Sequence, residues 1–482
     1  MGKIELIPGK SVNGDANDRQ NGREEILNVK GFYEQDSHIM PERLEERHVT
    51  LSDGSEHVWY EYVPENLTKE DKAPLVISFH GGGQDGYGQC YATSWTMLAD
   101  KYHFVTMFPT GAEDRRWNPD PASSDFLLVH ELIRRGQERY GIDEERIFIQ
   151  GMSMGNMMVT GLSKAEGYRY AGAGMAAGPD STELLTDPDY DVSNISPIPV
   201  FQSRGERDRM TPRKADCEIK DRYELNKADR EFWLKVNGCS LEPDVIKVDG
   251  RNNFFLYKGK KADLIFRDVK MRGHGQTIDD AEWVWRYCFS GARRKADGTL
   301  IMEEPLEKME SDQAVILADG CKKAYVNSQK VEIGAPVYQI IEHLEVPDDL
   351  KKMDPTLKPQ DFGPYTYVPV DFLAQVFGFE VKKTFDGHGA VLTKKAERYQ
   401  DACKAPCTIE VAEGNVACLY DGILCNMERQ AQICNEVLYI PVKDFAEKMG
   451  KRVLECDGIL YITDHAGELT HDFCRYMKEL LG

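Results

Sequence analysis

The sequence has few basic residues for its acidic content, and it lacks long apolar runs. Its 482 residues include 60 Lys and Arg against 81 Asp and Glu, a net charge of −21. An acidic surface repels phosphate backbones and anionic headgroups, and we find no local basic patch that would offset it. No run of about 18 apolar residues is present, as a membrane-spanning helix would need. We therefore expect neither nucleic acid nor a membrane as a partner.

Signals for export and for metal binding are also missing. The first 15 residues contain no apolar segment of roughly 7–15 residues, which a secretory signal requires. None of the twelve cysteines forms a Cys-x-x-Cys pair. The tightest group has spacings unlike a zinc site, and consists of Cys403, Cys407, Cys418, Cys425 and Cys434. We expect reduced thiols, no metal and a cytoplasmic location, or secretion if an export signal was trimmed from this chain.

Short apolar runs alternate with helix-compatible stretches from residue 48 to about residue 290. With 41% hydrophobic residues, a chain of this length can bury two or three cores. The pattern predicts a leading hairpin at 48–63, buried strands at 75–79, 104–108, 146–150, 199–203 and 264–269, and helices at 124–140, 222–236 and 277–289. This alternation predicts an α/β domain with a doubly wound, mostly parallel sheet.

A charged stretch after Ser290 ends this pattern, and an internal repeat follows it. Tyr-Val-Pro-Val at 367–370 recurs as Tyr-Ile-Pro-Val at 439–442, an offset of 72 residues. Each copy predicts a strand, a helix after the proline and a closing strand, so we expect a smaller α+β domain of two repeats. The predicted parts are an N-terminal extension at 1–47, the α/β domain at 48–292, a linker at 293–311 and the two-repeat domain at 312–482.

The segment Gly-Met-Ser-Met-Gly at 151–155 directly follows the predicted strand 146–150 and precedes a helix-compatible stretch. This is the context of a nucleophile elbow, in which flanking glycines let the chain turn sharply and expose the serine above the sheet. The pattern therefore predicts Ser153 as a nucleophile.

A serine hydroxyl needs a base to take its proton, and the base needs a carboxylate to orient it. His274 lies in a loop after a late strand of the first domain, which favours it as the base. His103 and His130 precede the serine and lie in predicted elements, so we interpret them as packing or surface residues. We expect the acid after the strand 199–203, where Asp208 is the first choice and Glu206 and Asp216 are alternatives.

A glycine-rich loop, His-Gly-Gly-Gly at 80–83, ends the predicted strand 75–79. Glycines let backbone N–H groups approach a substrate oxygen closely, so the loop predicts half of an oxyanion hole. The donors would be the N–H of Gly81 or Gly82 together with that of Met154. A phosphate-binding loop is excluded because no Gly-Lys-Ser/Thr follows.

Residues 50–290 resemble the polyhydroxybutyrate depolymerase and feruloyl esterase family of α/β-hydrolases, related to carbohydrate esterase family one. The resemblance rests on PLVISFHGGG, YGIDEERIFIQGMSMGNMM, PVFQSRGERDRMTP and GHGQTIDDAEWVWRYCFS, among others. It implies an α/β-hydrolase fold and places the nucleophile, acid and base on Ser153, Asp208 and His274. Two departures concern the pocket: SRGERD stands where members often have HGTAD, and Gly-Gln follows His274 in place of an aromatic-Pro pair.

The same resemblance places Trp117 near the active site, as a loop aromatic. Trp95, Met152 and Met154 could likewise line an aryl or acyl pocket.

The repeat region resembles the copper amine oxidase N-terminal-like domain, or stalk domain. The matching segments are AYVNSQKVEI, TYVPVDFLAQVFG and LYIPVKDFAEKMG. Its histidines give no ligand cluster in the sequence; they are His343, His388, His465 and His471. We therefore expect an accessory or assembly role, such as covering a substrate or forming a homo-oligomer through this C-terminal domain.

Together these features predict a serine esterase that needs no cofactor. Its substrates would be small-molecule or carbohydrate-linked esters, with hydroxycinnamoyl, acetyl or small aryl groups. Two alternatives stay open: a peptidase acting on short peptides, because a triad does not separate esters from amides, and a catalytically silent binding protein.

Overall fold

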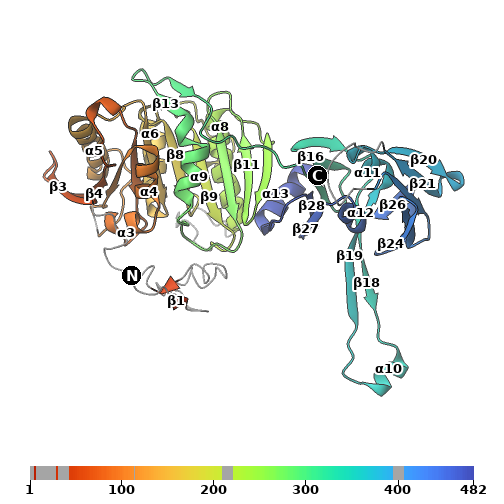
Figure 1. The fold of residues 1–482 in the computed structure, drawn as a ribbon. Coiled ribbons are helices and arrows are strands. Elements are labelled where there is room, and N and C mark those ends of the chain that lie inside the picture. Colours follow the sequence, from red (N-terminus) through yellow and green to blue (C-terminus); the bar gives the residue numbers. More distant parts are fainter. Residues whose placement is uncertain (1–4, 7–28, 31–42, 113, 209–220, 395–405) are drawn as a thin grey trace. The chain divides into compact units, whose positions relative to one another are not determined.

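The computed structural model describes residues 5–6, 29–30, 43–112, 114–208, 221–394 and 406–482 (Figure 1). Asp216 and Cys403, both considered above, lie outside these residues. The chain divides into two compact units, Met1–Lys247 with Arg251–Glu310, and Val248–Gly250 with Ser311–Gly482. No helix in the described part of the chain is long and apolar enough to cross a bilayer.

The first unit contains a ten-stranded sheet in the order β10-β11-β12-β9-β8-β7-β5-β6-β4-β3. The strands from β12 to β6 run parallel, and antiparallel pairs flank them. The bounds are β3 Glu45–Thr50, β4 Glu56–Tyr62, β5 Leu75–Phe79, β6 Val105–Pro109, β7 Ile147–Met152, β8 Gly172–Ala176, β9 Val200–Gly205, β10 Val245–Asp249, β11 Asn252–Tyr257 and β12 Leu264–Val269. The predicted α/β-hydrolase sheet is thereby confirmed.

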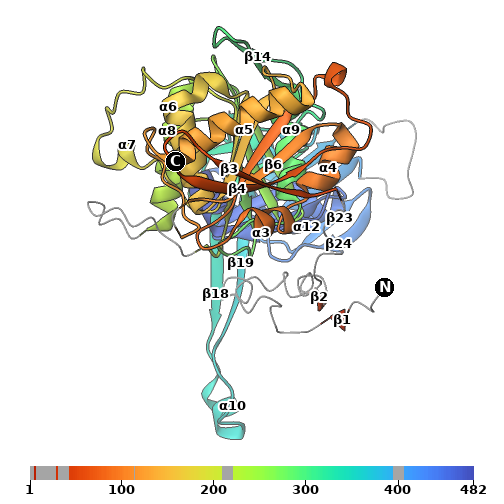
Figure 2. The same ribbon diagram turned by 90° about the vertical axis from the view of Figure 1, so that its left-hand side faces the viewer.

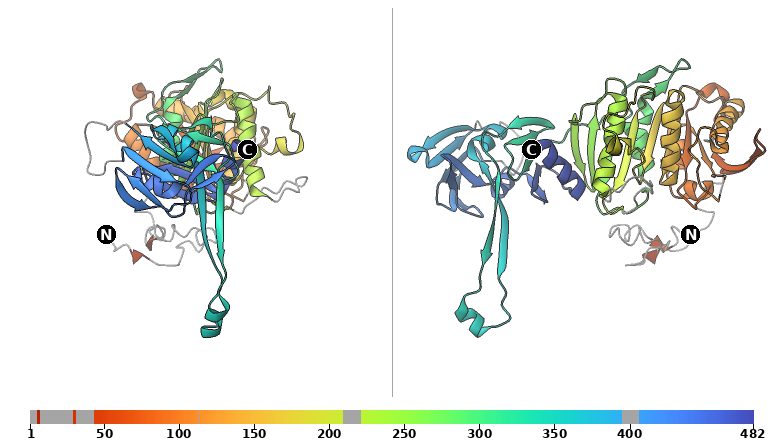
Figure 3. Two further views of the ribbon diagram at one scale, coloured as in Figure 1. Left: turned by 90° about the vertical axis from the view of Figure 1, so that its right-hand side faces the viewer. Right: turned by 180° about the vertical axis from the view of Figure 1, so that it is seen from behind.

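Helices cover both faces of this sheet. Helices α4 and α9 lie on one face, whereas α5, α6 and α8 lie on the other (Figures 1 and 3). On the first face the rings of Tyr102 and Trp285 stack with centroids 5.7 Å apart. The bounds are α3 Gly86–Tyr91, α4 Trp95–Tyr102, α5 Ser124–Tyr140, α6 Met154–Glu166, α7 Glu183–Thr186, α8 Arg222–Asn237 and α9 Asp280–Tyr287.

The predicted linker at 293–311 differs from the structure. Residues up to Glu310 cluster with the first unit, and they include a hairpin of β13 (Ala292–Arg294) and β14 (Leu300–Met302). Arg294 is buried, and its guanidinium donates hydrogen bonds to the carbonyl oxygens of Tyr170 (3.0 Å) and Pro197 (2.6 Å). A charged segment can therefore belong to a folded unit when backbone carbonyls accept its hydrogen bonds.

The second unit consists of antiparallel sheets around one core. Their orders are β17-β16-β15-β28-β27, β18-β19-β26-β25 and β20-β21-β22-β23-β24. The two repeats are β19 with α11 and β26 with α12, and the ring centroids of Phe377 and Phe445 lie 5.2 Å apart between them. The bounds are β15 Val315–Ala318, β16 Lys323–Val326, β17 Gln329–Glu332, β18 Tyr338–Leu344, α10 Asp348–Met353, β19 Gln360–Pro369, α11 Val370–Val376, β20 Glu380–Thr384, β21 Gly389–Thr393, β22 Thr408–Ala412, β23 Ala417–Tyr420, β24 Ile423–Asn426, β25 Gln432–Cys434, β26 Val437–Pro441, α12 Val442–Lys448, β27 Arg452–Cys456, β28 Ile459–Thr463 and α13 His471–Leu481.

Strands β18 and β19 extend from this unit as a two-stranded arm with α10 at its tip (Figures 1 and 2). The arm residues Glu342–Leu344 and Gln360–Pro364 are exposed, and so are all six residues of α10. None of the residues 341–366 belongs to the hydrophobic core of the unit. The arm is therefore held mainly by its own strand pairing, with an ion pair between Glu342 and Arg429 near its base.

Candidate active site

Ser153 occupies the turn between β7 and α6, at the carboxyl end of the central strands. Its backbone has φ 56° and ψ −116°, a conformation that costs a non-glycine residue about 1–3 kcal/mol. The flanking glycines permit the turn, because a β-carbon at position 151 would lie 2.3 Å from the Gly155 carbonyl oxygen. A β-carbon at position 155 would lie 2.2 Å from the Phe79 carbonyl oxygen. The strand, turn and helix that the sequence predicted around Ser153 are all present.

The structure brings Ser153, His274 and Asp208 together. The Oγ atom of Ser153 lies 2.8 Å from Nε2 of His274. The other ring nitrogen, Nδ1, lies 3.1 Å from each carboxylate oxygen of Asp208. Asp208 is almost fully buried, and the His274 side chain is 12% exposed. In this arrangement the imidazole can take the proton of the serine hydroxyl, while the buried carboxylate orients the ring and can stabilise its charge.

Glu206, an alternative for the acid, makes other contacts. One of its carboxylate oxygens accepts a hydrogen bond from Nζ of Lys270 (2.8 Å), and the other accepts one from the backbone N–H of Met271 (2.9 Å). These contacts join the loop that contains Asp208 to the loop that contains His274. Glu206 is therefore placed to position the triad, whereas Asp208 contacts the imidazole itself.

A buried histidine orients the glycine-rich loop. The N–H of Gly111 donates to His80 Nε2 (3.0 Å), so the proton of the neutral ring is on Nδ1, which donates to the Gly81 carbonyl oxygen (2.7 Å). Burial lowers the pKa of His80, which keeps the ring neutral. Since the carbonyl of Gly81 and the N–H of Gly82 point in opposite directions across one peptide plane, His80 also fixes the direction of the Gly82 N–H.

The contacts of the loop distinguish between the two predicted glycine donors. The N–H of Gly81 already donates to Oε1 of Gln84 (3.3 Å). Within the described residues no hydrogen bond uses the N–H of Gly82, and Met154 is the first residue of α6, where helical N–H groups lack partners in their own helix. A β-carbon at position 82 would lie 2.6 Å from Sδ of Met154, so the loop and the elbow are adjacent. The N–H groups of Gly82 and Met154 are therefore better placed than that of Gly81 as candidate oxyanion donors.

Two of the predicted substrate-contacting residues are buried. Trp95 has no exposed surface, and its ring stacks on Phe289. The prediction that Trp95 contacts the substrate is therefore wrong. Trp117 is 4% exposed, and its indole N–H donates to the His80 carbonyl oxygen (2.8 Å). The structure thus places Trp117 behind the glycine loop as a support. Met152 stays a candidate for substrate contact, because it is partly exposed and touches Gly81.

Sequence reasoning missed a ring of hydrogen bonds beside the His274 loop. The amide of Gln276 donates to Gln89 (3.1 Å), Gln89 donates to Ser78 (2.9 Å), Ser78 donates to Gln150 (2.7 Å), and Gln150 donates back to Gln276 (3.1 Å). The indole N–H of Trp95 also donates to Gln150 (3.2 Å). Through Gln276, which follows His274 by two residues, the ring joins this loop to α3, β5 and β7. The only signal in the sequence was the departure from the family pattern at position 276.

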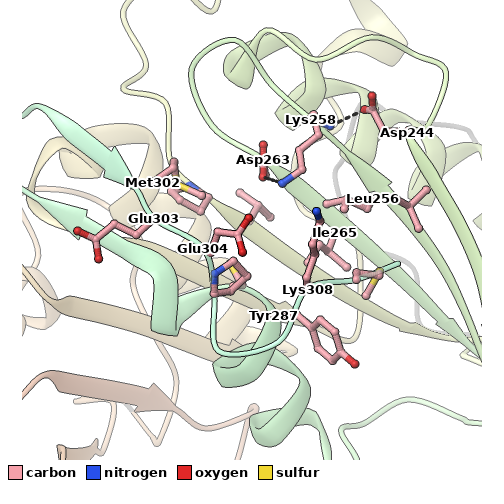
Figure 4. Close-up of a pocket in the computed structure, with 16 residues that line it drawn as sticks. Asp244, Leu256, Lys258, Asp263, Ile265, Tyr287, Met302, Glu303, Glu304 and Lys308 are labelled. Atoms are coloured by element: carbon pink, nitrogen blue, oxygen red, sulfur yellow. Dashed lines mark hydrogen bonds and ion pairs between the residues drawn. The ribbon is translucent and has the colours of Figure 1, made fainter. Parts of the chain in front are cut away.

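A cavity of about 300 Å³ in the first unit lies away from the triad. Its walls include Val200 and Ile265, near the amino ends of β9 and β12, whereas Asp208 and His274 follow the carboxyl ends of these strands. Lys258 at its rim pairs with Asp263 (Figure 4). Because ligands of open α/β sheets bind beyond the carboxyl ends of the strands, this cavity is not the candidate active site.

Comparisons with known proteins agree with the α/β-hydrolase fold. Residues 66–232 match the sequence profile of the phospholipase/carboxylesterase family, and the matched stretch includes β5, the glycine loop and Ser153. The match ends before the repeat region, so the stalk-domain resemblance stays a prediction.

Two curated proteins that match this chain in sequence are named as esterases. A bifunctional acetylxylan esterase/xylanase of Neocallimastix patriciarum is 28% identical over 239 residues, which are 47% of this chain and 32% of that protein. Feruloyl esterase B of Talaromyces stipitatus is 26% identical over 114 residues, 22% of this chain and 31% of that protein. The chain thus spans about a third of the length of these relatives. The solved acetyl xylan esterase from Aspergillus awamori is 17% identical, covers 50% of this chain and 98% of its own, and has a TM-score of 0.38.

Proposed function

We propose that this protein is a serine carboxylesterase that acts through an acyl-enzyme. The hydrogen-bonded chain from Ser153 through His274 to Asp208 is the observation that supports this proposal most strongly. The carboxyl ends of the central strands hold these three residues beside the glycine loop. This region would therefore supply both the nucleophile and the hydrogen-bond donors for the oxyanion.

The proposed reaction has two halves. Ser153 Oγ attacks the ester carbonyl while His274 Nε2 takes its proton, and the N–H groups of Gly82 and Met154 donate to the oxyanion. Asp208 accepts the hydrogen bond of His274 Nδ1 and stabilises the imidazolium. His274 then protonates the leaving alcohol, which leaves an acyl group on Ser153. Water, deprotonated by His274, releases the acid and restores the serine.

We propose acetyl and hydroxycinnamoyl esters of plant carbohydrates as the substrate class. The names of the curated relatives, an acetylxylan esterase and a feruloyl esterase, support this choice. The chemistry needs no metal or organic cofactor, because backbone amides stabilise the charge.

The test compares 4-nitrophenyl acetate, methyl ferulate, acetylated xylan and a short peptide amide as substrates. We expect hydrolysis of the esters but not of the peptide, and covalent labelling of Ser153 by a fluorophosphonate. Ser153→Ala should lower kcat by roughly 10⁴-fold or more. Ser52→Ala, at an exposed serine of the β3–β4 turn, is the matched control and should leave the rate unchanged. Cleavage of the peptide alone would indicate a peptidase, and no turnover with any substrate would indicate a binding protein.

A further inference from the structure

Three metal-ligating atoms converge in the second unit, at the turn between β27 and β28. The Sγ atom of Cys456 lies 3.8 Å from Nδ1 of His471, and Oδ2 of Asp457 lies 2.6 Å from the same nitrogen. All three ligand atoms lie within 4.8 Å of one another. The expectation that no histidine of the repeat region joins a ligand cluster is therefore wrong for His471.

Two rigid elements hold these side chains. Strands β27 and β28 are joined by a two-residue turn in which Asp457 (φ 47°) and Gly458 (φ 72°) are both left-handed, as a tight Asp-Gly hairpin turn requires. His471 is the first residue of α13, and the Thr470 side chain caps this helix by accepting a hydrogen bond from the Phe473 N–H (3.1 Å). The donor atoms are thus preorganised by a turn and a capped helix.

The sulfur–nitrogen distance and the donor types fit a zinc-type ion, whereas Oδ2 of Asp457 and Nδ1 of His471 would have to move apart from their hydrogen-bond distance of 2.6 Å. With Zn–S near 2.3 Å and Zn–N near 2.0–2.1 Å, two ligands of a tetrahedral ion lie about 3.6 Å apart, close to the observed contact between sulfur and nitrogen. A thiolate with an imidazole and a carboxylate favours zinc over magnesium or calcium, which prefer oxygen ligands. His471 and Asp457 are 64% and 48% exposed, so a water molecule can reach a fourth position.

We propose that Cys456, Asp457 and His471 bind one zinc-type divalent ion, with water completing the tetrahedron. The ion would replace the hydrogen bond between His471 and Asp457, and it would join the β27–β28 turn to the start of α13. Because a ligand that binds only the folded state stabilises that state, the ion would stabilise the second unit. It would have no part in ester hydrolysis, whose proposed residues all belong to the first unit.

The test uses the full-length, reduced protein and Co²⁺ as a spectroscopic substitute for Zn²⁺. We expect one Co²⁺ per chain with tetrahedral d–d bands and a thiolate-to-cobalt charge-transfer band, and a higher thermal midpoint when Zn²⁺ is added. Removal of the ion with EDTA should lower this midpoint and leave the rate of ester hydrolysis unchanged.

Single substitutions assign the ligands. Cys456→Ser should abolish the charge-transfer band, and both it and Asp457→Asn should lower the Co²⁺ affinity by at least about tenfold. Asn tolerates the left-handed conformation, so Asp457→Asn preserves the turn. Cys434→Ser, at an exposed cysteine of the same unit, is the matched control and should keep the band. The proposal would be overturned if the charge-transfer band persists in Cys456→Ser, or if the wild-type protein shows no such band. Circular dichroism of the metal-free variants checks that they are folded.

Discussion

The neighbouring carboxylates Asp208 and Glu206 differ in what they contact, and this difference can be measured. Asp208→Asn cannot stabilise the imidazolium of His274, so we expect kcat to fall by roughly 10⁴-fold with little change in KM. Glu206→Gln keeps an oxygen that can accept from the Met271 N–H, so we expect kcat within about tenfold of wild type. Steady-state kinetics with 4-nitrophenyl acetate compares them, and the reverse ranking would make Glu206 the acid.

His80 predicts a pH dependence of stability. Burial lowers its pKa in the folded protein, whereas in the unfolded chain it binds a proton near its ordinary pKa of about 6.5. Below that pH the unfolded state binds more protons at this position, so the free energy of unfolding falls as the pH is lowered. We expect His80→Gln, which cannot titrate, to show a flatter dependence between about pH 6.5 and 5. Urea unfolding at several pH values measures it, and equal slopes for both proteins would contradict the explanation.

At the scale of residues, the sequence predicted what depends on chain order and missed what depends on distant contacts. Ser153, Asp208 and His274 follow the order of strands and loops, so their motifs could be found without a structure. The support that Trp117 gives to His80 joins residues 37 positions apart. The contact from Gln276 to Gln89 joins residues 187 positions apart. No local pattern records such pairs.

At the scale of elements, the ring of amides should matter because it holds the His274 loop. Gln276→Leu would leave Oε1 of Gln89 and Nε2 of Gln150 without these partners, at a cost of about 1–3 kcal/mol for each buried group. We expect lower stability and a fall in kcat of roughly 10–100-fold, since displacement of a catalytic group by about 1 Å has such effects. Kinetics and urea unfolding test this against Ile278→Ala, an exposed position of the same loop. Unchanged kcat in Gln276→Leu would mean that the ring does not position His274.

The arm of the second unit should be dispensable for folding. Ile340 and Tyr365 are register partners, so replacing residues 341–364 by Asn-Gly would close β18 and β19 with a two-residue turn. Because the unit's buried core contains no arm residue, we expect the thermal midpoint to change by less than about 3 °C. A larger loss, measured by circular dichroism against the intact chain, would show that the arm supports the fold.

Strands were predicted correctly where apolar runs are continuous. They were missed where burial by neighbouring strands, and not the local sequence, determines the structure. Strand β5 was predicted at its observed bounds, Leu75–Phe79, because a strand covered on both faces needs such a run. Strand β8, Gly172–Ala176, was missed since glycine and alanine have low strand propensity, and only burial between β7 and β9 makes them a strand. The arm was missed because polar and apolar residues are mixed at 341–364 and its large apolar side chains, such as Ile341 and Phe362, are exposed, so no burial pattern marks its strands.

At the scale of the whole molecule, the two units predict a division of labour that truncation can test. All proposed triad and oxyanion residues belong to the first unit, which ends at Glu310. We therefore expect a chain ending at Glu310 to hydrolyse 4-nitrophenyl acetate with kcat within about tenfold of the full chain. Activity on larger natural esters, solubility or oligomeric state should change, because the second unit is absent.

The residue at which the chain is truncated should affect the stability of the first unit. A chain ending at Ser290 loses Arg294, whose buried guanidinium donates to the carbonyls of Tyr170 and Pro197, and leaves both oxygens without these donors. We expect this shorter chain to unfold at lower urea concentration than the chain ending at Glu310, while both keep Ser153 and His274. Light scattering, circular dichroism and kinetics on small and large esters compare the two with the full protein. A folded chain ending at Glu310 that fails even on the small ester would show that the second unit supplies part of the active site, and the division of labour would be wrong.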